Sequence, residues 1–412
     1  MLISIGIILY TLCICTASLF NKKARLWVRG RKGQFGKLRE TFRDGARPVW
    51  VHCASLGEYE QARPLIERIK SEQPGTRVLV TFFSPSGYEV RKDDPLPDHV
   101  FYLPSDTRRH ARRFLQIVRP RMAIFIKYEF WYNYIRQLHE QHIPIYYVCA
   151  IFRPDQYFFK PWGRWFAKQL RNVSGFFVQN QESENLLRSI GAQRVEVCGD
   201  TRFDRVWAIA SQSGTLDFAE RFRQDRKLIV AGSTWGPDEE LLSRLLPHLH
   251  NYKLLVAPHE VSRKAEVAKT FGQHKTVLFS NATEESLKDA DVLVLDTVGL
   301  LSKTYQYSHV SYVGGGFRTG LHNILEAAVF GTPLFFGPKY SHFNEAVELV
   351  SRKGAFPVRS SGEMYGILRR FEETPETYRD TCDICRRYVA ENIGARDRIY
   401  ESIFTTKNEN HP

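Results

Sequence analysis

Residues 48–58 read Pro-Val-Trp-Val-His-Cys-Ala-Ser-Leu-Gly-Glu, and this stretch decides the fold class. Its first half is an apolar run typical of a buried β-strand, and its second half is a turn of small residues that opens a helix. Backbone amides at such a turn point into the crevice above a parallel sheet, where ligands bind. Glu58 is therefore a candidate general base for an incoming hydroxyl, although a glutamate in a first helical turn can also serve only to stabilise the helix.

The same alternation continues along the chain. Residues 81–87, Thr-Phe-Phe-Ser-Pro-Ser-Gly, repeat the passage from an apolar run to a small-residue turn. A first series of strands is predicted at residues 48–55, 77–84, 99–103, 122–126, 143–149, 175–179 and 195–198. A second series is predicted at residues 228–231, 253–257, 276–279, 291–295, 310–313 and 333–336. Strands that alternate with charged helical stretches indicate an α/β fold, here with two Rossmann-like domains facing across a cleft.

Length and composition indicate a two-domain globular protein with an anionic partner. The 412 residues suit two domains of roughly 150 to 200 residues each. The formal net charge of +13 suits nucleic acid, acidic lipid or a phosphorylated substrate, and the sign alone does not choose among them. The seven cysteines are odd in number and scattered, which argues for a reducing compartment. Cys382 and Cys385 have CxxC spacing but lack two further ligands nearby, so we interpret the spacing as coincidental.

The N-terminus predicts a membrane anchor. Residues 2–20 contain no charged side chain, and as a helix they would extend over roughly 28 Å, close to the hydrocarbon thickness of a bilayer. Cations follow this run, whereas a secretory signal peptide carries its positive charge before it. The order predicts an uncleaved anchor in the inner membrane, with the following domains on the cytoplasmic face. A helix buried in the folded body is the alternative.

These patterns divide the chain into six segments. The boundaries follow the apolar run, the two series of strands and a polar junction at residues 223–227. We predict a membrane-anchor helix at 1–21, a basic juxtamembrane segment at 22–46, an N-terminal Rossmann-like domain at 47–205, a linker at 206–227, a C-terminal Rossmann-like domain at 228–372, and helices at 373–412 that could pack back on the first domain.

The strongest phosphate-binding signal follows a predicted strand in the second half. Residues 312–317 read Tyr-Val-Gly-Gly-Gly-Phe, and residues 320–326 read Gly-Leu-His-Asn-Ile-Leu-Glu. Glycines let the backbone approach a phosphate, and a helix that begins around Asn323 would supply amide donors. Glu326 could accept hydrogen bonds from two ribose hydroxyls. A plain glycine loop is the alternative, but His322, Asn323 and Glu326 favour a ligand site.

A second candidate edge is Gly232-Ser-Thr234, which also follows a strand and precedes a helix. It can face a phosphate, although N-capping of the helix by Ser233 or Thr234 would explain the same residues. No GxxxxGK[ST] motif occurs, so an ATPase is not indicated. Asp289 and Asp291 resemble a metal-binding DxD motif but precede an apolar strand, and we predict no metal and no cofactor.

Two further groups of polar residues belong to the first half. Glu129 follows the strand at 122–126 and could support Glu58 or hold a sugar hydroxyl, or it could pair with Lys127. Residues 152–168 interleave seven aromatic residues with four basic ones. That pattern suits insertion among lipid headgroups and pairing with lipid phosphates. Packing of the aromatic side chains in the core is the alternative.

Eight short motifs occur in a fixed order along the chain. They are Ala54-Ser-Leu-Gly-Glu58, Glu129-Phe-Trp131, Gly199-Asp-Thr-Arg-Phe-Asp204, Gly232-Ser-Thr234, Asp296-Thr-Val-Gly299, Val313-Gly-Gly-Gly316, His322-Asn-Ile-Leu-Glu326 and Phe336-Gly-Pro338. Together they resemble the bacterial 3-deoxy-D-manno-octulosonic acid (Kdo) transferases, from the N-terminus to near residue 400.

The resemblance implies a GT-B fold and transfer of Kdo from CMP-Kdo to the tetraacyl lipid A precursor, lipid IVA, in lipopolysaccharide biosynthesis. It makes Glu58 the general base and Glu129 the second catalytic glutamate. The residues assigned to the donor are Gly232, Ser233, Thr234, His259, Gly314, Gly315, Gly316, His322, Asn323 and Glu326. Those assigned to the acceptor or membrane side are Ser55, Gly57, Ser84, Arg153, Lys160, Arg164 and Arg202. The family inverts the anomeric carbon in one displacement without a metal. The partners expected are CMP-Kdo, lipid IVA and inner-membrane phospholipids, and no nucleic acid.

Three departures from the family's motifs concern cations. Ala257-Pro-His-Glu260 stands where members often read Ala-Pro-Arg-His, and Cys149-Ala-Ile151 stands in place of Asn-Ala-Arg. Arg202 replaces a lysine, which keeps the charge but changes its geometry. Two alternatives to Kdo transfer remain: another membrane-associated GT-B transferase that uses a UDP-sugar, and a non-catalytic protein that binds anionic lipid.

Overall fold

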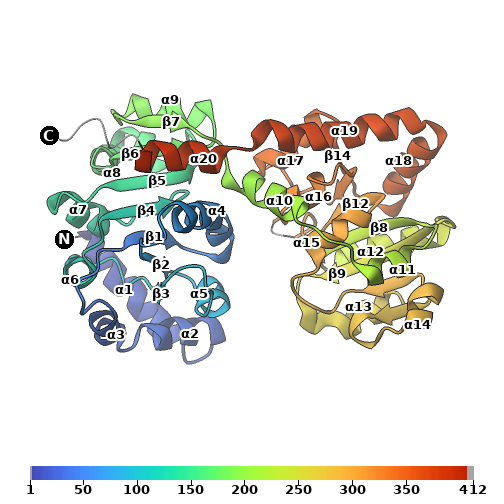
Figure 1. Ribbon diagram of the computed structural model, residues 1–412, viewed down its shortest axis with the longest axis horizontal. Helices are drawn as coiled ribbons and strands as arrows, with labels where there is room; N and C mark the ends of the chain where they lie inside the picture. Colours follow the sequence, from blue (N-terminus) through green and yellow to red (C-terminus); the bar gives the residue numbers. More distant parts are fainter. Residues whose placement is uncertain (1, 319, 406–412) are drawn as a thin grey trace. The chain divides into compact units, whose positions relative to one another are not determined.

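The computed structural model describes residues 2–318 and 320–405. They form two compact units, the first from residues 2–205 with 393–405 and the second from residues 206–318 with 320–392 (Figure 1). Each unit contains one seven-stranded sheet in which all the strand pairings are parallel. The predicted α/β class with two Rossmann-like halves is therefore confirmed.

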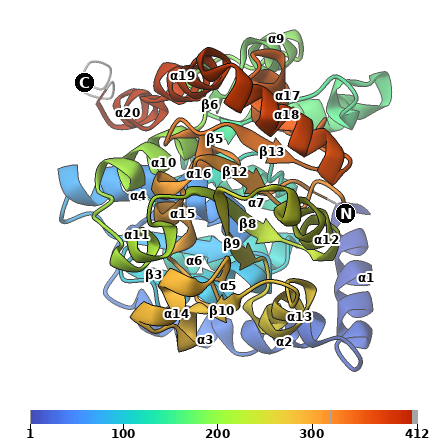
Figure 2. The same cartoon turned by 90° about the vertical axis from the view of Figure 1, so that its right-hand side faces the viewer.

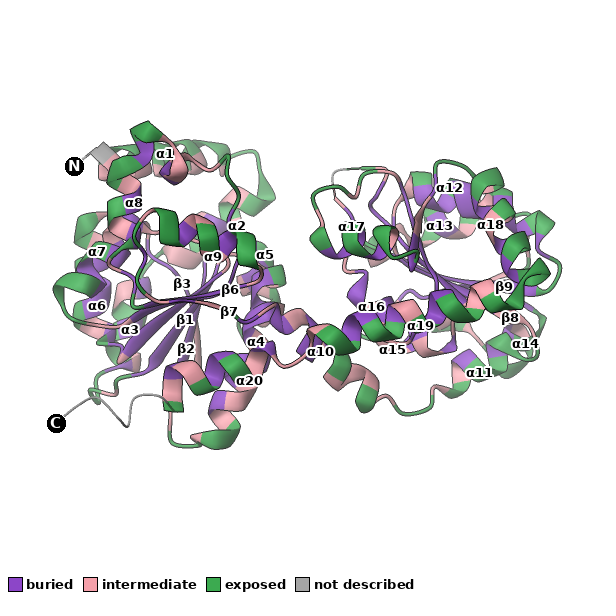
Figure 3. Ribbon diagram, turned by 90° about the horizontal axis from the view of Figure 1, so that it is seen from above, coloured by how far each residue is buried: buried purple, intermediate pink, exposed green. Residues whose placement is uncertain are grey.

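The first unit has the strand order β3-β2-β1-β4-β5-β6-β7. Its strands are β1 (Val49–Cys53), β2 (Val78–Phe82), β3 (His99–Tyr102), β4 (Met122–Ile126), β5 (Ile145–Ala150), β6 (Gly175–Val178) and β7 (Val195–Val197). Its helices are α1 (Leu2–Ala17), α2 (Lys22–Arg31), α3 (Gln34–Thr41), α4 (Leu56–Glu72), α5 (Pro85–Arg91), α6 (Arg108–Val118), α7 (Tyr132–Glu140), α8 (Arg164–Leu170), α9 (Gln181–Ser189) and α20 (Ala395–Tyr400). The central strands are buried along their whole length (Figure 3), as expected when helices cover both faces of a parallel sheet.

The second unit has the strand order β10-β11-β9-β8-β12-β13-β14. Its strands are β8 (Lys227–Thr234), β9 (Tyr252–Pro258), β10 (Thr276–Leu278), β11 (Val292–Val294), β12 (Val310–Val313), β13 (Leu334–Phe336) and β14 (Ala355–Pro357). Its helices are α11 (Asp217–Arg223), α12 (Gly236–Leu245), α13 (Lys264–Thr270), α14 (Glu284–Asp289), α15 (Leu301–Thr304), α16 (Leu325–Ala328), α17 (Asn344–Ser351), α18 (Ser361–Glu373) and α19 (Pro375–Asn392). Helices α18 and α19 pack side by side in this unit (Figure 2).

The direction in which strands are added to the sheet reverses once in each unit. In the first unit the reversal lies between β1 and β4, which pair directly, and in the second it lies between β8 and β12. Loops at the carboxyl ends of two such strands diverge to opposite faces of the sheet and leave a crevice between them, where ligands of open α/β sheets bind. In the first unit, Glu58 follows β1 and Glu129 follows β4. In the second unit, Thr234 is the last residue of β8 and Gly314 comes directly after β12.

The N-terminal helix differs from the predicted anchor. Helix α1 ends at Ala17, because Asn21 caps α2 by accepting hydrogen bonds from Lys23 N–H (2.9 Å) and Ala24 N–H (3.1 Å). No helix within residues 2–318 and 320–405 is long and apolar enough to cross a bilayer, so a membrane-spanning helix at residues 1–21 is not supported. Instead, Ile3 packs against the core of the first unit. The opposite side of α1 exposes Ile5, Ile8, Leu9 and Leu12.

The segment after α1, predicted as a basic juxtamembrane stretch, folds into α2 and α3. Arg31 is largely buried there: its guanidinium stacks 3.8 Å from the centre of the Trp27 ring and donates to the carbonyls of Phe83 (2.8 Å) and Leu103 (3.0 Å). Since Phe83 and Leu103 directly follow β2 and β3, Arg31 fastens α2 to the carboxyl edge of the sheet.

The chain leaves the first unit through α10 (Thr201–Ser211) and returns to it at Ile393. The Asp204 carboxylate fixes the return by accepting hydrogen bonds from Gly394 N–H (2.7 Å) and Arg396 N–H (3.1 Å). Helix α20 then packs against α4. The two aspartates of the Gly199–Asp204 motif are thus both buried and structural, since Asp200 accepts from the Gln61 amide at 2.9 Å.

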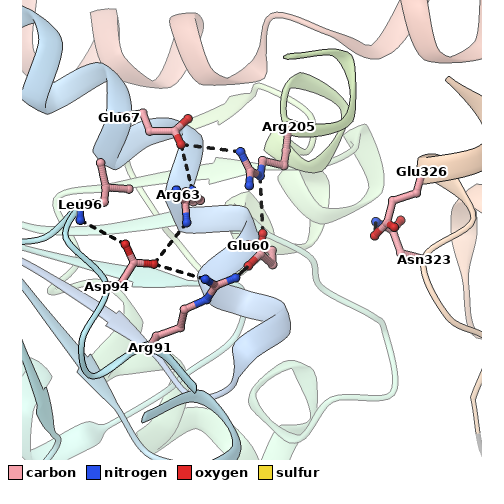
Figure 4. A network of polar contacts seen from close by, with 9 residues as sticks. All are labelled: Glu60, Arg63, Glu67, Arg91, Asp94, Leu96, Arg205, Asn323 and Glu326. Atoms are coloured by element: carbon pink, nitrogen blue, oxygen red, sulfur yellow. Dashed lines mark hydrogen bonds and ion pairs between the residues drawn. The ribbon is translucent and has the colours of Figure 1, made fainter. Parts of the chain in front are cut away.

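Helix α4, which carries Glu58, is held by a network of ion pairs (Figure 4). Arg91 bonds Glu60 at 2.8 Å, and Arg205 reaches both Glu60 (3.5 Å) and Glu67 (3.6 Å). Asp94 accepts from Arg63 at 3.2 Å and from Leu96 N–H at 3.1 Å. Networks of this kind restrict side chains that are already ordered, so each added pair costs less entropy than an isolated surface pair.

Two glycines near the start of α4 offer a matched test of this packing. A Cβ on Gly87 would lie 2.3 Å from the Phe82 ring and 3.2 Å from the Leu56 nitrogen, whereas a Cβ on Gly57 meets nothing within 4 Å. Gly87→Ala should therefore lower the free energy of unfolding by about 1–3 kcal/mol through overpacking. Gly57→Ala should be neutral or raise it by up to about 1 kcal/mol, because alanine favours the helix. Chemical denaturation followed by circular dichroism measures both, and equal stabilities of the two variants would contradict the tight contact at Gly87.

Candidate active site

Glu58 is placed by the turn between β1 and α4. Ser55 is the residue before the helix, Glu58 lies in the first turn, and the Ala54 N–H donates a hydrogen bond back to the Glu58 carboxylate. Only 7% of Glu58 is exposed. The turn brings one carboxylate to the carboxyl end of β1, as predicted from the sequence, and the structure shows in addition that this carboxylate is largely buried.

Glu129 lies in the loop between β4 and α7. Its carboxyl group interacts electrostatically with that of Glu58. The loop begins with Lys127, whose backbone adopts φ = 62°, a strained conformation for a residue other than glycine. Burial raises the pKa of the Glu58 carboxyl well above its usual value, and the Lys127 charge opposes the rise. Burial, together with the charge of Glu58, raises the pKa of Glu129 further.

These two raised pKa values define the chemistry available to the pair. Burial disfavours ionisation of both carboxyls, and the charge of Glu58 further disfavours ionisation of Glu129, so Glu58 is the one that ionises first. The carboxylate that ionises first is a base of matched strength for a hydroxyl proton. Perturbed pairs of this kind are typical of active sites, although ion-pair networks also produce them.

The predicted acceptor-side residues nearest to Glu58 lie on two adjoining loops. Ser84 N–H donates to the Ala54 carbonyl at 2.8 Å, which joins the β2–α5 turn to the β1–α4 turn. Ser84 also caps α5 by accepting from Ser86 N–H at 3.3 Å, and Ser55 and Gly57 flank the start of α4. Gly57 is exposed and Ser55 is half-buried, so both are accessible beside Glu58.

The other predicted acceptor-side cations divide between the surface and the interior. Arg202 is bound to the buried Asp200 at 2.9 Å, which gives it a structural role that the sequence did not reveal. Arg153 is exposed, and its backbone N–H donates to the Gln156 side chain at 2.9 Å. Lys160 and Arg164 line a groove of about 470 Å³ together with Phe158 and Phe159.

The aromatic segment 152–168 combines both interpretations considered for it. Phe152 and Phe158 belong to the hydrophobic core of the first unit. Trp162 and Trp165 are 71% and 50% exposed. The core therefore accounts for the phenylalanines, while the tryptophans and the adjacent Arg164 face the surface.

In the second unit the three glycines after β12 are required by the protein's own backbone. A Cβ on Gly314 would lie 2.3 Å from the Ser233 carbonyl oxygen, and one on Gly316 would lie 2.6 Å from the Gly337 carbonyl oxygen. Gly315 has φ = 95° and lies against Gly320. The glycines bring three loops together at the carboxyl edge of the sheet, so close backbone packing explains them without a phosphate.

Asp238, in the first turn of α12, is the buried centre of this loop cluster. Its carboxylate accepts hydrogen bonds from Trp235 N–H (2.9 Å), Gly315 N–H (3.1 Å) and Tyr312 O–H (2.9 Å). Burial raises the pKa of the Asp238 carboxyl, and these donors oppose the rise. An aspartate at the third position of a helix is a capping signal, but its bond to Gly315 across the sheet has no signature in sequence.

His259 and His322 meet Trp235 above this cluster. The two imidazoles stack with ring centroids 4.3 Å apart, and the Trp235 N–H donates to His322 Nε2 at 3.3 Å. Because an indole nitrogen only donates, His322 Nε2 must be the unprotonated acceptor, and the neutral ring carries its proton on Nδ1. Burial agrees with this assignment, since it lowers the pKa of His322 to about 4.

Two arginines lie around Trp235. Arg263 is bound to the buried Glu239 at 2.8 Å, and Thr234 O–H also donates to Glu239 at 3.0 Å, so this arginine secures the β8–α12 loop. Arg318 is exposed and lies 4.6 Å over the Trp235 ring. No carboxylate within the described parts of the chain forms an ion pair with Arg318.

Asn323 and Glu326 lie together (Figure 4), but the helix near them differs from the prediction. The Asn323 amide donates to Glu326 at 3.1 Å. Helix α16 begins only at Leu325, where the Asn323 side chain accepts from Leu325 N–H at 3.2 Å, and it covers a single turn. The helix dipole expected at Asn323 is therefore weak, and the side chains carry the polarity of this loop.

Comparison with known proteins supports the resemblance drawn from the motifs. The profile of a family described as 3-deoxy-D-manno-octulosonic-acid transferase (kdotransferase) matches residues 28–205. The 3-deoxy-D-manno-octulosonic acid transferase of Aquifex aeolicus is 27% identical over 337 residues, which cover 79% of this chain and 86% of that protein. The enzyme of the same name from Haemophilus influenzae is 26% identical and is covered to 87%, as is this chain. A bifunctional glycosyltransferase/methyltransferase of Fusobacterium nucleatum is 25% identical, and the chain spans 52% of its length.

Solved structures of other enzymes show the same fold at low identity. The UDP-GlcNAc 2-epimerase of Neisseria meningitidis matches with a TM-score of 0.61 at 17% identity, over 87% of this chain and all of that one. MurG of Acinetobacter baumannii matches with a TM-score of 0.56 at 12% identity, over 87% of this chain and 99% of that one. These likenesses establish a GT-B-like architecture. With that architecture, a family profile that matches residues 28–205 and relatives at 25–27% identity, the chain is similar to the Kdo transferases, a family of glycosyltransferases.

Proposed function

We propose that the protein transfers Kdo from CMP-Kdo to a hydroxyl of the lipid A precursor, with Glu58 as the general base. The observation that carries the proposal is the pair of largely buried carboxylates, Glu58 and Glu129, at the ends of the two strands where the sheet order reverses. A lipid-binding protein without catalytic activity would not need a base of raised pKa. A transferase does, because it must take a proton from the attacking hydroxyl.

The reaction is a single displacement at the anomeric carbon. Glu58 takes the proton from the acceptor hydroxyl as that oxygen forms a bond to the anomeric carbon of Kdo. The bond from this carbon to the phosphate oxygen breaks, and CMP leaves with the electron pair. Glu129, whose pKa is raised further than that of Glu58, favours its protonated form near neutral pH, which leaves Glu58 as the carboxylate that ionises and accepts the proton.

The loop cluster of the second unit is proposed to hold the donor. His322 offers an N–H at Nδ1, and Arg318 offers a guanidinium without a partner carboxylate in the described residues. Both are suited to the phosphodiester and carboxylate of CMP-Kdo, whose charge grows on the phosphate as CMP leaves. Arg318 is thus our candidate for the donor-side cation that the family's Ala-Pro-Arg-His motif would otherwise supply.

We further propose that the first unit works at the cytoplasmic face of the inner membrane. Support comes from α1, whose outward side exposes apolar residues 43–58% while cations follow at Lys22, Lys23 and Arg25. The exposed Trp162 and Trp165 belong to the same unit. Apolar and aromatic side chains flanked by cations favour an interface of acyl chains and anionic headgroups, where a lipid acceptor would be found.

Replacing the proposed base tests the reaction. Glu58→Gln should lower the rate of Kdo transfer to solubilised lipid IVA by about 10²- to 10⁴-fold, the usual contribution of a general base. Mass spectrometry of the lipid, with freshly generated CMP-Kdo as donor, measures the transfer. Glu67→Gln on the same helix should retain activity within about threefold, because Glu67 makes only surface ion pairs. Full activity of Glu58→Gln would remove Glu58 as the base, and no transfer by the wild type would favour a UDP-sugar donor.

The pH profile reports the same group. Burial raises the pKa of Glu58 to about 7, and the base works only when ionised. Below that pKa, kcat/KM should therefore fall about tenfold per pH unit, and above it the profile should level off. Glu129→Gln should keep this acid limb, because burial is the main cause of the raised pKa. A profile that stays flat from pH 5 to pH 8 would contradict a base with a raised pKa.

Trp235 is expected to set the tautomer of His322. In Trp235→Phe the hydrogen bond to Nε2 is lost, so the Nδ1–H tautomer is no longer enforced, and the donor KM should rise by about two- to tenfold with little change in acceptor KM. Nitrogen-15 NMR of the imidazole should show Nδ1–H in the wild type and a mixture of tautomers in the variant. A wild-type ring protonated on Nε2 would contradict the assignment.

A further inference from the structure

Five arginines line a groove on the first unit that includes neither Glu58 nor Glu129. It lies between α3, α6 and α7 and has a volume of about 1160 Å³. The arginines that line it are Arg39, Arg108, Arg109, Arg112 and Arg113, and we call this site the arginine groove. Four of them come from α6, where spacings of one, four and five residues place them along one side of the helix.

The positive charge of the arginine groove exceeds the negative charge of the side chains that line it. None of its five guanidinium groups forms an ion pair with a carboxylate within residues 2–318 and 320–405. The one acidic residue that lines it, Glu140, is already bound by Arg136 at 2.7 Å. Arg113 is held 4.4 Å over the Phe35 ring, which fixes one wall. Like charges held this close repel one another, so an anion in the groove would relieve an unfavourable interaction.

An apolar pocket adjoins the arginine groove along α7. The second half of α7 lines the arginine groove with Gln137, Glu140 and Gln141. Its first half lines a pocket of about 460 Å³, whose apolar wall consists of Ile3, Tyr132, Trp165 and Phe166. The start of α1 touches both sites, because Ile3 lines the pocket and the Ser4 hydroxyl accepts from Arg108 N–H at 3.4 Å.

We propose that the arginine groove and this pocket together bind one anionic phospholipid, with the phosphate headgroup among the arginines and an acyl chain along Ile3, Trp165 and Phe166. Guanidinium groups bind phosphate oxygens in pairs, and the neighbouring pocket offers an apolar wall to a hydrocarbon chain. Nucleic acid would use the charge but not the pocket. The proposal rests on the membrane location proposed above and is independent of the transfer chemistry.

Two quadruple variants separate the groove from general charge. R108Q/R109Q/R112Q/R113Q removes four charges from the arginine groove, and R369Q/R370Q/R386Q/R387Q removes four from exposed helices of the second unit. Sedimentation with phosphatidylcholine vesicles containing about a third phosphatidylglycerol should show at least about a tenfold loss of binding for the first variant and less than about threefold for the second. An equal loss in the two variants would overturn the proposal.

A matched pair of tryptophan variants tests the apolar pocket. Trp165→Ala should weaken binding of a short-chain, monomeric phosphatidylglycerol at least about threefold, whereas Trp162→Ala, which alters an exposed tryptophan outside the pocket, should not. Glycerol phosphate that binds as tightly as the lipid would reduce the site to one for free phosphate and overturn the lipid assignment. Tighter binding of a single-stranded RNA oligomer at the same arginines would also overturn it.

The same vesicles test the membrane location. Wild-type protein that fails to sediment with anionic vesicles would overturn both the location and the lipid site. Transfer to detergent-solubilised lipid IVA reports the proposed function separately. R108Q/R109Q/R112Q/R113Q should retain that activity, because neither Glu58 nor Glu129 is among the residues that line the arginine groove.

Discussion

The desolvation of two neighbouring carboxylates is the constraint on which the site depends. Glu58 and Glu129 follow β1 and β4, which pair directly because the strand order reverses between them. This pairing brings the two loops to the crevice at the point where the strand order reverses. The cost of burying the charges raises both pKa values, and this cost is also what makes a carboxylate basic enough to take a hydroxyl proton near neutral pH. Fold topology and acid–base chemistry are in this sense one property of the first unit.

The strand order also reverses in the second unit, but the side chains at that point are chemically different. Its reversal lies between β8 and β12, and there the polar groups are neutral or cationic: His322, held in one tautomer by Trp235, and Arg318 over the Trp235 ring. Rigidity comes from Asp238, which joins the loop before α12 to the backbone of Gly315. Preorganised donors of this kind stabilise a leaving phosphate without rearranging during the reaction. In the proposed reaction the first unit would supply the base and the second unit the hydrogen-bond donors, as group transfer between two substrates requires.

Local patterns were sufficient to predict most of the architecture. Apolar runs ending in small-residue turns predicted thirteen strands at positions where strands occur. They missed β14, an edge strand of three residues that ends in Pro357 and is too short to show a period. The position of Glu58 at the turn after β1 was also predicted, because Ala54, which bonds its carboxylate, is close to it in sequence. The structural contacts of Asp238 and Arg202 could not be predicted from the sequence. Nothing in the sequence indicates that these side chains bind Gly315 and Asp200 and not a ligand.

The N-terminal helix illustrates a limit of a different kind. Because α1 is apolar on every side, its sequence has no periodicity that could say which side meets protein and which meets something else. The structure divides it: Ile3 packs on the core, while Ile5, Ile8, Leu9 and Leu12 stay exposed. Because α1 is packed on the first unit, insertion of its exposed side into a membrane interface would fix the distance of that unit from the membrane. The arginines of α6 would then lie where headgroup phosphates are found, because the Arg108 backbone is bonded to the first turn of α1. Helix packing within the first unit would in this way determine how the acceptor loops at Glu58 approach a lipid surface.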